Sequence, residues 1–139
     1  MSEKSEVVIR RFFLQVIGQG RIEVLDDLLR TCYIEHRQGS LFDVTAGIKT
    51  EMQAIRDAFP NRMVVVEDMA FAGDLVWCRW SLSAEHRRPF MGFPATGTVI
   101  ETSGVDVFRI DKGRIAERWT HQGSLGLRRQ LELVTPVAV

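Results

Sequence analysis

The first half of the chain carries apolar residues at the spacing of amphipathic helices. Between residues 3 and 18 they recur at helical intervals, with charged residues elsewhere on the wheel: Val8, Ile9, Phe12, Phe13, Val16 and Ile17. Ser2 is a candidate N-cap, and Gly18 and Gly20 mark the predicted end of this helix. The pattern therefore predicts a first helix with one apolar face.

Two further helices are predicted before the pattern changes. A shorter helix fits residues 21–29, and a third begins near Thr45 or Ala46 and ends at Ala58. The intervening residues 31–45 show neither a helical nor an alternating period, so they are predicted to be irregular.

From residue 62 onward the sequence is typical of β-strands joined by tight turns. The pairs Gly73-Asp74 and Lys112-Gly113 each mark a hairpin turn. Residues 124–133 are predicted to form a short closing helix. Helices followed by an antiparallel meander define an α+β fold. The strands of that meander are predicted at 62–72, 74–86, 98–110 and 114–122.

Length and charge narrow the classes of function. The chain of 139 residues suits a single domain, 1–139, that is long enough to bury a core. Its 18 basic and 18 acidic residues give a formal net charge of zero, so nothing points to nucleic acid or an anionic membrane as a partner. A chain near neutrality has little colloidal repulsion, which fits an oligomer.

The termini and the two cysteines add further expectations. The N-terminus shows no basic region followed by an apolar stretch, and no apolar run approaches the roughly 20 residues that a membrane span needs. We therefore expect a cytoplasmic protein. Cys32 and Cys78 show no metal-ligand spacing, and two reduced, buried thiols are expected, with a disulfide between them as the alternative. With no Gly-rich phosphate loop and no metal cluster in the sequence, neither a cofactor nor a metal is expected.

The strand predicted at 98–110 places one carboxylate among apolar side chains. Because side chains alternate along a strand, Asp106 shares a face with Ile100, Phe108 and Ile110. A buried carboxylate must find a partner or take up a proton. Asp106 is therefore either a structural residue, bonded to backbone or to an arginine, or a group that lines a pocket.

The last predicted strand offers two partners for Asp106. Arg118 and Thr120 share one face of that strand and could reach Asp106 across the hairpin. An arginine in that position would hold Asp106 in its ionised form.

Three stretches of the sequence together resemble a known family. They are Arg10-Arg-Phe-Phe…Ile-Gly-Gln-Gly20, Phe90-Met-Gly-Phe-Pro-Ala-Thr-Gly97 and Gly104-Val-Asp-Val-Phe-Arg-Ile-Asp-Lys-Gly-Arg-Ile-Ala-Glu-Arg-Trp119. From about Val7 to Leu131 the chain resembles the SnoaL-like polyketide cyclases of the nuclear transport factor 2-like superfamily. The resemblance implies a cone-shaped barrel, in which a curved, mostly antiparallel sheet wraps around three N-terminal helices. A ligand would lie between the helices and the concave sheet.

The resemblance also suggests roles for single residues. In the ketosteroid isomerases of this superfamily, an Asp in a similar Asp-Val-x-Arg run matches Asp106 and donates a hydrogen bond to an oxyanion as a neutral acid. His36 falls where those enzymes carry their general base, and an imidazole there could relay a proton, or could simply bond the backbone. Phe13 stands where the isomerases carry a Tyr, Thr120 where the cyclases carry an Asp, and Gly123 where many relatives carry an Asp.

These observations predict a protein that binds a hydrophobic, carbonyl-bearing small molecule without a cofactor. If it is an enzyme, we expect enolisation, isomerisation or aldol-type closure, with His36 as the base and Asp106 as the acid on the oxyanion side. Contacts with the ligand are expected from Phe13, Tyr33, Trp80, Phe108, Arg118 and Thr120.

The alternative is a non-catalytic module of the same fold that binds a ligand or another protein. The residues at positions 13, 120 and 123 favour that alternative, because related enzymes carry working groups there. In either case we expect a homodimer through the outer face of the sheet, since Trp and Val side chains on that face would otherwise leave a large apolar patch.

Overall fold

The helices lie where the sequence predicted them, with differences in type. The computed structural model of the chain describes residues 2–38, 47–90 and 92–122. The first helix is an α-helix that continues as a π-helix, and the second is a 3-10 turn followed by a single α-helical turn. The third ends at Ala58 as predicted, while the expected closing helix at 124–133 lies outside the described residues. The elements are α1 (Ser2–Arg11), η1 (Phe12–Gly18), η2 (Ile22–Val24), α2 (Leu25–Leu28) and α3 (Ile48–Ala58).

The described strands form one sheet in the order β1-β5-β4-β3-β2. Neighbouring strands are antiparallel except β1 and β5, which run parallel. Four strands match the predicted ranges closely, whereas β1 lies in the segment that was predicted to be irregular. That prediction was wrong because β1 pairs with a strand far away in the sequence, so no adjacent turn marks it. The strands are β1 (Leu29–Gln38), β2 (Met63–Ala72), β3 (Leu75–Glu85), β4 (Val99–Asp111) and β5 (Arg114–Gln122).

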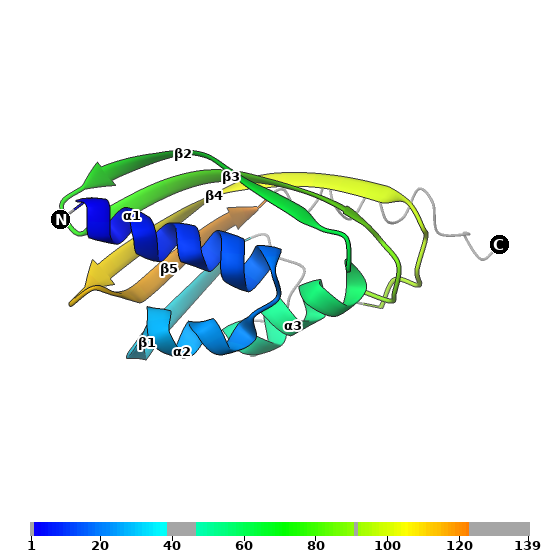
Figure 1. The fold of residues 1–139 in the computed structure, drawn as a ribbon, viewed down its shortest axis with the longest axis horizontal. Coiled ribbons are helices and arrows are strands. Elements are labelled where there is room, and N and C mark those ends of the chain that lie inside the picture. The colour runs from blue at the N-terminus through cyan, green and yellow to red at the C-terminus, as the bar shows by residue number, and fades with distance from the viewer. Residues whose placement is uncertain (1, 39–46, 91, 123–139) are drawn as a thin grey trace.

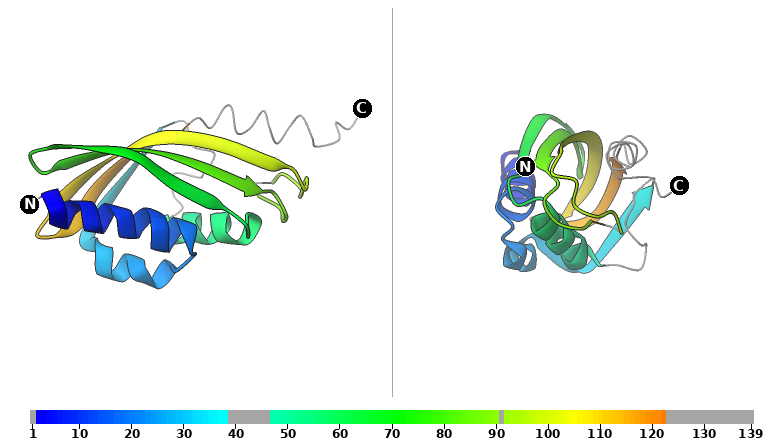
Figure 2. Two further views of the ribbon diagram at one scale, coloured as in Figure 1. Left: turned by 45° about the horizontal axis from the view of Figure 1, so that its top comes forward. Right: turned by 90° about the vertical axis from the view of Figure 1, so that its right-hand side faces the viewer.

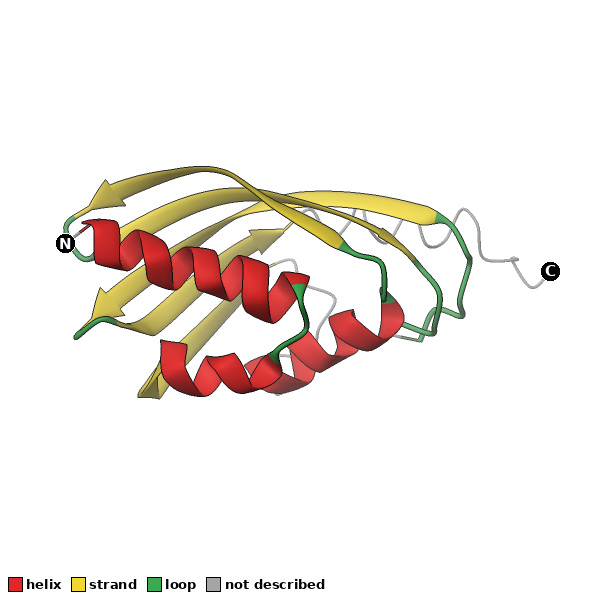
Figure 3. Ribbon diagram, viewed as in Figure 1, coloured by secondary structure: helices red, strands yellow, loops and turns green. Residues whose placement is uncertain are grey.

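The sheet curves around the helices as a cone that is not closed. Figure 1 shows the long strands β2, β3 and β4 passing above α1, while α2 and α3 lie below α1 in the same view. Seen end-on in Figure 2, the sheet forms an arc whose open side is occupied by the helices. Figure 3 shows the two layers, helices on the concave side and strands outside them. The predicted cone-shaped α+β fold is confirmed.

The π-helical segment η1 turns two adjacent aromatic rings into the core. Phe12 and Phe13 are both fully buried, and their rings meet the ring of Phe108 on β4 edge to face, at centroid distances of 5.5 and 6.0 Å. Consecutive residues of a regular α-helix lie about 100° apart around the helix axis, so it is harder to bury two adjacent side chains in one core. Segment η1 therefore attaches the first helix to the centre of the sheet.

Both hairpin turns have the backbone conformation that their sequences predict. At the β4–β5 turn, Lys112 and Gly113 have φ values of 52° and 75°, and positive φ at both central positions is the mark of a type I′ turn. At the β2–β3 turn, Gly73 has a φ of 62°, which suits the first central position of a type II′ turn. These turns set the pairing at the start of each hairpin, and a register shift between Arg109 and Ile110 then brings Thr120 opposite Asp106.

The two cysteines are unpaired thiols in different environments. Cys78 is buried as expected, but Cys32 is exposed. Burial raises the pKa of Cys78 to about 12, and the charge of Asp106 adds to the effect. None of the helices among the described residues is long and apolar enough to cross a membrane.

His86, which follows β3, is a fully buried histidine outside any pocket described below. Its backbone pairs with Thr98 and Gly97, its Nδ1 lies 3.1 Å from the hydroxyl of Thr96, and its ring packs on Phe59. Its Nε2 has no hydrogen-bond partner within the described part of the chain. Burial lowers the pKa of His86 below its ordinary value of 6.5.

We therefore expect acid to destabilise the protein through His86. The unfolded chain takes up a proton on this residue at about pH 6.5, whereas the folded chain takes it up only at lower pH. Stability is thus lost as pH falls through about 6.5 towards the folded-state pKa. Replacement of His86 by the non-titrating Gln should flatten the dependence of unfolding free energy on pH between 7 and 5.5, as measured by urea denaturation. Equal slopes for His86→Gln and the wild type would contradict this.

Candidate functional site

Asp106 lies at the centre of a buried group of hydrogen bonds. Its Oδ1 accepts from Trp80 Nε1 at 3.1 Å and from Thr120 Oγ1 at 2.6 Å, and its Oδ2 accepts from Arg118 Nε at 2.9 Å. The carboxylate is 0% exposed. Three donors from β3 and β5 therefore satisfy its two oxygens, and the sequence-based expectation that Arg118 and Thr120 could reach it is met.

Arg118 is the cation on which the neighbouring carboxylates converge. Besides Asp106, its Nη1 lies 3.0 Å from Glu35 Oε2 and 3.9 Å from Glu51 Oε1, and its guanidinium stacks 5.0 Å from the centre of the Phe12 ring. Burial by itself lowers the pKa of Arg118, but the surrounding carboxylates outweigh it and raise the pKa well above the ordinary value. Arg118 therefore keeps its charge in the core.

Glu35 joins this group through the parallel pairing of β1 with β5. The register sets Glu35 beside Arg118, on the concave face of the sheet. The hydroxyl of Tyr33 also donates a hydrogen bond to Glu35. Burial raises the pKa of Tyr33 well above its usual value, and Glu35 adds to the rise, so Tyr33 stays a neutral donor.

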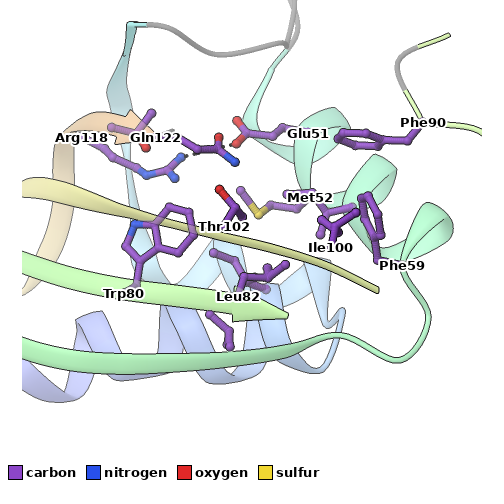
Figure 4. A pocket seen from close by; sticks show the side chains of 14 residues that line it. Glu51, Met52, Phe59, Trp80, Leu82, Phe90, Ile100, Thr102, Arg118 and Gln122 are labelled. Carbon is purple, nitrogen blue, oxygen red and sulfur yellow. Dashed lines mark ion pairs between the residues drawn. The ribbon is translucent and has the colours of Figure 1, made fainter. Parts of the chain in front are cut away.

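A small cavity of about 40 Å³ lies between α3 and the concave face of the sheet. Figure 4 shows the side chains of Arg118, Glu51, Gln122 and Thr102 gathered towards one end, and aromatic and aliphatic side chains at the other. The cavity is thus apolar over most of its wall and polar at one end. The apolar lining residues are Ile17, Met52, Ile55, Phe59, Val64, Trp80, Leu82, Phe90 and Ile100, and Thr120 lies with the polar group.

Of the predicted ligand-contact residues, some line the cavity and others lie behind its wall. Trp80, Arg118 and Thr120 line the cavity. Phe13 and Phe108 pack against each other and are fully buried, so they lie behind the wall in the core. Tyr33 acts on the site through its hydrogen bond to Glu35.

His36 lies on the outer face of the sheet, opposite to Asp106. Its register partner is Trp119, on which its ring stacks with a centroid distance of 5.0 Å, and its Nε2 lies 2.7 Å from Glu117 Oε2. The hydrogen bonds from His36 and from Arg109 lower the pKa of Glu117. The structure therefore does not bring the predicted base and acid to one ligand, because Glu35, one residue earlier on β1, takes the inward position.

Four polar residues of the site were missing from the sequence-based prediction: Glu35, Glu51, Thr102 and Gln122. Glu35 would have been found if residues 29–38 had been read as a strand, because the parity of Tyr33 and Glu35 opposes that of His36. Glu51 occupies the buried face of α3 beside Met52, and a carboxylate within an apolar stripe was the available signal. Thr102 has the parity of Asp106 and belongs to the same inward set.

The charged groups of the site are arranged around a guanidinium and not around a metal. Among the residues that the structure describes, no group of three or more His, Cys, Asp or Glu side chains could hold a metal ion. Asp106, Glu35 and Glu51 point instead towards Arg118. The arrangement can orient a polar ligand group and can exchange protons with it through a carboxyl group.

The chain belongs to the SnoaL-like polyketide cyclase family, whose sequence model matches residues 7–131. Among solved structures, a proposed polyketide cyclase from Acidithiobacillus ferrooxidans is 29% identical with a TM-score of 0.82, over 95% of this chain and 96% of that one. IdmH, a proposed polyketide cyclase from Streptomyces antibioticus, is 27% identical with a TM-score of 0.75, over 93% and 98% of the two chains. No curated protein matches the chain.

More distant structures share the fold under a different named activity. AclR, a proposed hydroxylase from Streptomyces galilaeus, is 19% identical with a TM-score of 0.81, over 96% of this chain and 98% of that one. At this identity the likeness concerns the fold alone. Because one fold serves several activities, the reaction must be argued from the site.

We expect the buried bonds of Asp106 to stabilise the fold. Asp106→Leu would leave Thr120, Trp80 and part of Arg118 without their acceptor, which should cost roughly 3 kcal/mol of unfolding free energy. The matched control is Asp68→Leu, which removes an ion pair with Arg79 on the surface and should cost less than about 1 kcal/mol. Urea denaturation measures both. Equal losses in the two variants would contradict a structural role for Asp106.

Proposed function

We propose that the protein binds a hydrophobic small molecule bearing a carbonyl group, and that it promotes proton transfer next to that carbonyl without a cofactor. The observation that carries this proposal is the two-ended cavity, in which an apolar wall adjoins a polar cluster. An apolar pocket with a few convergent polar groups is the usual form of a small-molecule site. Membership of the polyketide cyclase family supports the same class of ligand.

The orientation of the ligand follows from the two ends of the cavity. Its hydrocarbon part would lie against Phe59, Leu82 and Ile100, while its carbonyl oxygen would face Arg118 and Thr102. Among bonds between described residues, Arg118 donates through Nε and Nη1, which leaves Nη2 to bind a ligand oxygen. The guanidinium would then be held in place for the ligand by Asp106 and Glu35.

Ligand binding must enlarge the cavity. Its volume of about 40 Å³ holds only a few water molecules, whereas ligand pockets usually measure roughly 300–1,000 Å³. Met52 is the wall residue best suited to move, because its unbranched side chain adapts its shape readily.

A non-catalytic ligand-binding protein is the second candidate. It is favoured by Asp106, whose two oxygens already accept three hydrogen bonds, so its carboxylate is poorly placed to act as a neutral acid. Thr120 lies at the position where the cyclases that the sequence resembles carry an Asp. Its hydroxyl donates a hydrogen bond to the same Asp106 carboxylate. The two candidates agree on the ligand and differ only in whether it reacts.

Ligand binding can be tested with 2-tetralone, a bicyclic ketone. We expect Ile100→Phe to weaken its binding about tenfold or more, because the larger ring enters the cavity and must be displaced. Val7→Phe, on the exposed face of α1, serves as the control and should bind like the wild type. Ligand-observed NMR titration measures the affinities. If the wild type fails to bind 2-tetralone, or if Ile100→Phe binds it equally well, the proposed site is wrong.

We further propose that two copies of the chain associate through the outer face of the sheet. Trp77 is 46% exposed there, next to a groove that it forms with neighbouring side chains. Ile34 and Val99 are also exposed on this face. Burial of such a patch against a second copy would remove apolar area from water. The groove is lined by Leu75, Trp77, Val107, Trp119 and His121.

Light scattering at micromolar concentration tests this assembly. We expect a mass of about twice the 15.8 kDa of one chain, and a monomer for Trp77→Glu, because the substitution would bury a charge in the interface. Val7→Glu places the same charge on α1 and should leave the mass unchanged. A monomeric wild type, or a dimer that persists in Trp77→Glu, would contradict the assignment of this face.

A further inference from the structure

Glu51 is a buried carboxylate in the wall of the cavity, at its polar end. It lies in the first turn of α3, with the residue only 4% exposed, and it faces the concave sheet beside Met52. Figure 4 shows its carboxyl group directed towards Arg118 and Gln122, at the polar end of the cavity. Its position gives it direct access to whatever occupies that space.

Glu51 lies farthest from Arg118 of the three carboxylates that surround this cation. Arg118 lies within 4.0 Å of three carboxylates, at 2.9 Å from Asp106, 3.0 Å from Glu35 and 3.9 Å from Glu51. Of these three carboxylates, Glu51 is the one that lines the cavity.

The other acidic groups of the site are committed to hydrogen bonds. Asp106 accepts from three side chains, and Glu35 accepts from Tyr33 and Arg118. Protonation of either would break an existing bond to a buried donor. Neither Asp106 nor Glu35 lines the cavity, whereas Glu51 does.

Thr102 supplies an independent sign that a ligand belongs at this end of the cavity. Its Oγ1 is buried and has no hydrogen-bond partner among the residues that the structure describes. An unsatisfied buried hydroxyl is costly, so such a group usually serves a ligand or an ordered water molecule. Thr102 lines the cavity together with Glu51 and Arg118, and Figure 4 shows all three around the same space.

We propose that Glu51 is the catalytic base that removes a proton from the carbon next to the ligand's carbonyl group. The C–H bond breaks, its electron pair forms the C=C bond of an enolate, and the carbonyl π electrons move to the oxygen. The proton passes to the carboxylate of Glu51. Thr102 Oγ1 and Arg118 donate hydrogen bonds to the enolate oxygen. The carboxyl proton of Glu51 exchanges with solvent, and return of a hydrogen from Glu51 to the carbon completes the exchange. The inference rests on the proposed binding of a carbonyl ligand in this cavity.

The charge balance of this step is favourable. The negative charge moves from Glu51 to the enolate oxygen, so the site holds the same total charge before and after the transfer. Arg118 remains ionised throughout, because the surrounding carboxylates raise its pKa. The same base would serve enolisation, isomerisation and the first step of an aldol closure, since each begins with loss of this proton.

Hydrogen–deuterium exchange at the α-carbon of 2-tetralone in D₂O tests the proposal, with NMR as the readout and the full-length protein as catalyst. We expect the wild type to exchange faster than buffer, and Glu51→Gln to lose roughly 100-fold or more of the protein-dependent rate while affinity for 2-tetralone changes little. Glu51→Asp keeps a carboxylate one methylene shorter and should retain part of the rate. Asp57→Asn removes an exposed carboxylate from the same helix and should leave the rate unchanged.

The outcomes separate this proposal from the one on which it rests. If 2-tetralone does not bind the wild type, the proposed function is wrong, and the assignment of Glu51 as the base is wrong as well. If it binds but exchanges no faster than in buffer, the protein is a binding module and Glu51 is not a base. If exchange is accelerated equally in the wild type and in Glu51→Gln, the proposed function stands and the assignment of Glu51 is overturned. Thermal unfolding of each variant shows whether a loss of rate comes from misfolding. If Glu51→Gln does not fold, Glu51→Asp replaces it as the test: a rate between those of the wild type and buffer supports Glu51 as the base, and an unchanged rate contradicts it.

Discussion

The buried ion pair between Asp106 and Arg118 is the constraint on which the rest of the site depends. A lone charge in the core would cost several kcal/mol, and an ion pair in the core persists only when its remaining hydrogen-bonding groups are also satisfied. Here Trp80 and Thr120 also donate to the carboxylate, and the guanidinium contacts Glu35 and the Phe12 ring. These partners lie on β3, β5, β1 and η1, so the need to satisfy one pair of charges brings separate parts of the chain to a single point.

This network separates groups that shape the site from groups that are available to a ligand. Asp106 and Glu35 accept bonds from the protein itself, and their effect on a ligand would pass through the position of Arg118. Glu51 and Thr102 line the cavity, and the hydroxyl of Thr102 has no hydrogen-bond partner among the described residues. A site built in this way can hold one rigid cation for an oxygen atom while a second group exchanges protons, which is the division of labour that acid–base chemistry next to a carbonyl needs.

The sequence predicts those parts of the site whose geometry is local. Alternation along β5 puts Arg118 and Thr120 on one face, and the type I′ turn at Lys112-Gly113 joins β5 to β4. A register shift between Arg109 and Ile110, which the sequence did not predict, then sets Thr120 opposite Asp106. The parallel strand β1 has no such turn, and its pairing with β5 spans most of the chain. A single position along β1 decides which face a side chain occupies. The resemblance to the ketosteroid isomerases therefore suggested His36 as a site residue, whereas the side chain that faces the site is that of its neighbour Glu35.

The close contact between Trp80 and Gly104 shows how a local detail positions the cation. A Cβ atom at Gly104 would lie only 2.7 Å from Cζ2 of Trp80 and 2.6 Å from the carbonyl oxygen of His121. The absence of a side chain at this position therefore gives the indole room to lie across β4. From there its Nε1 reaches Asp106, two residues further along the same face. Glycine at position 104 is thus part of the site, although it carries no polar group of its own.

The identity of residue 120 links this network to the choice of base. Cyclases that the sequence resembles carry an Asp at this position, where a carboxylate would here lie beside Asp106 and compete with it for Arg118. Thr120 instead donates to Asp106 and adds no charge. Under the proposed function the base therefore comes from outside the β4–β5 hairpin, and the carboxylate that lines the cavity from α3 is Glu51. The sheet thus carries a hydroxyl where those cyclases carry an acid, and the facing helix carries a buried acid. A transfer of the proton-accepting role from strand to helix would require both features.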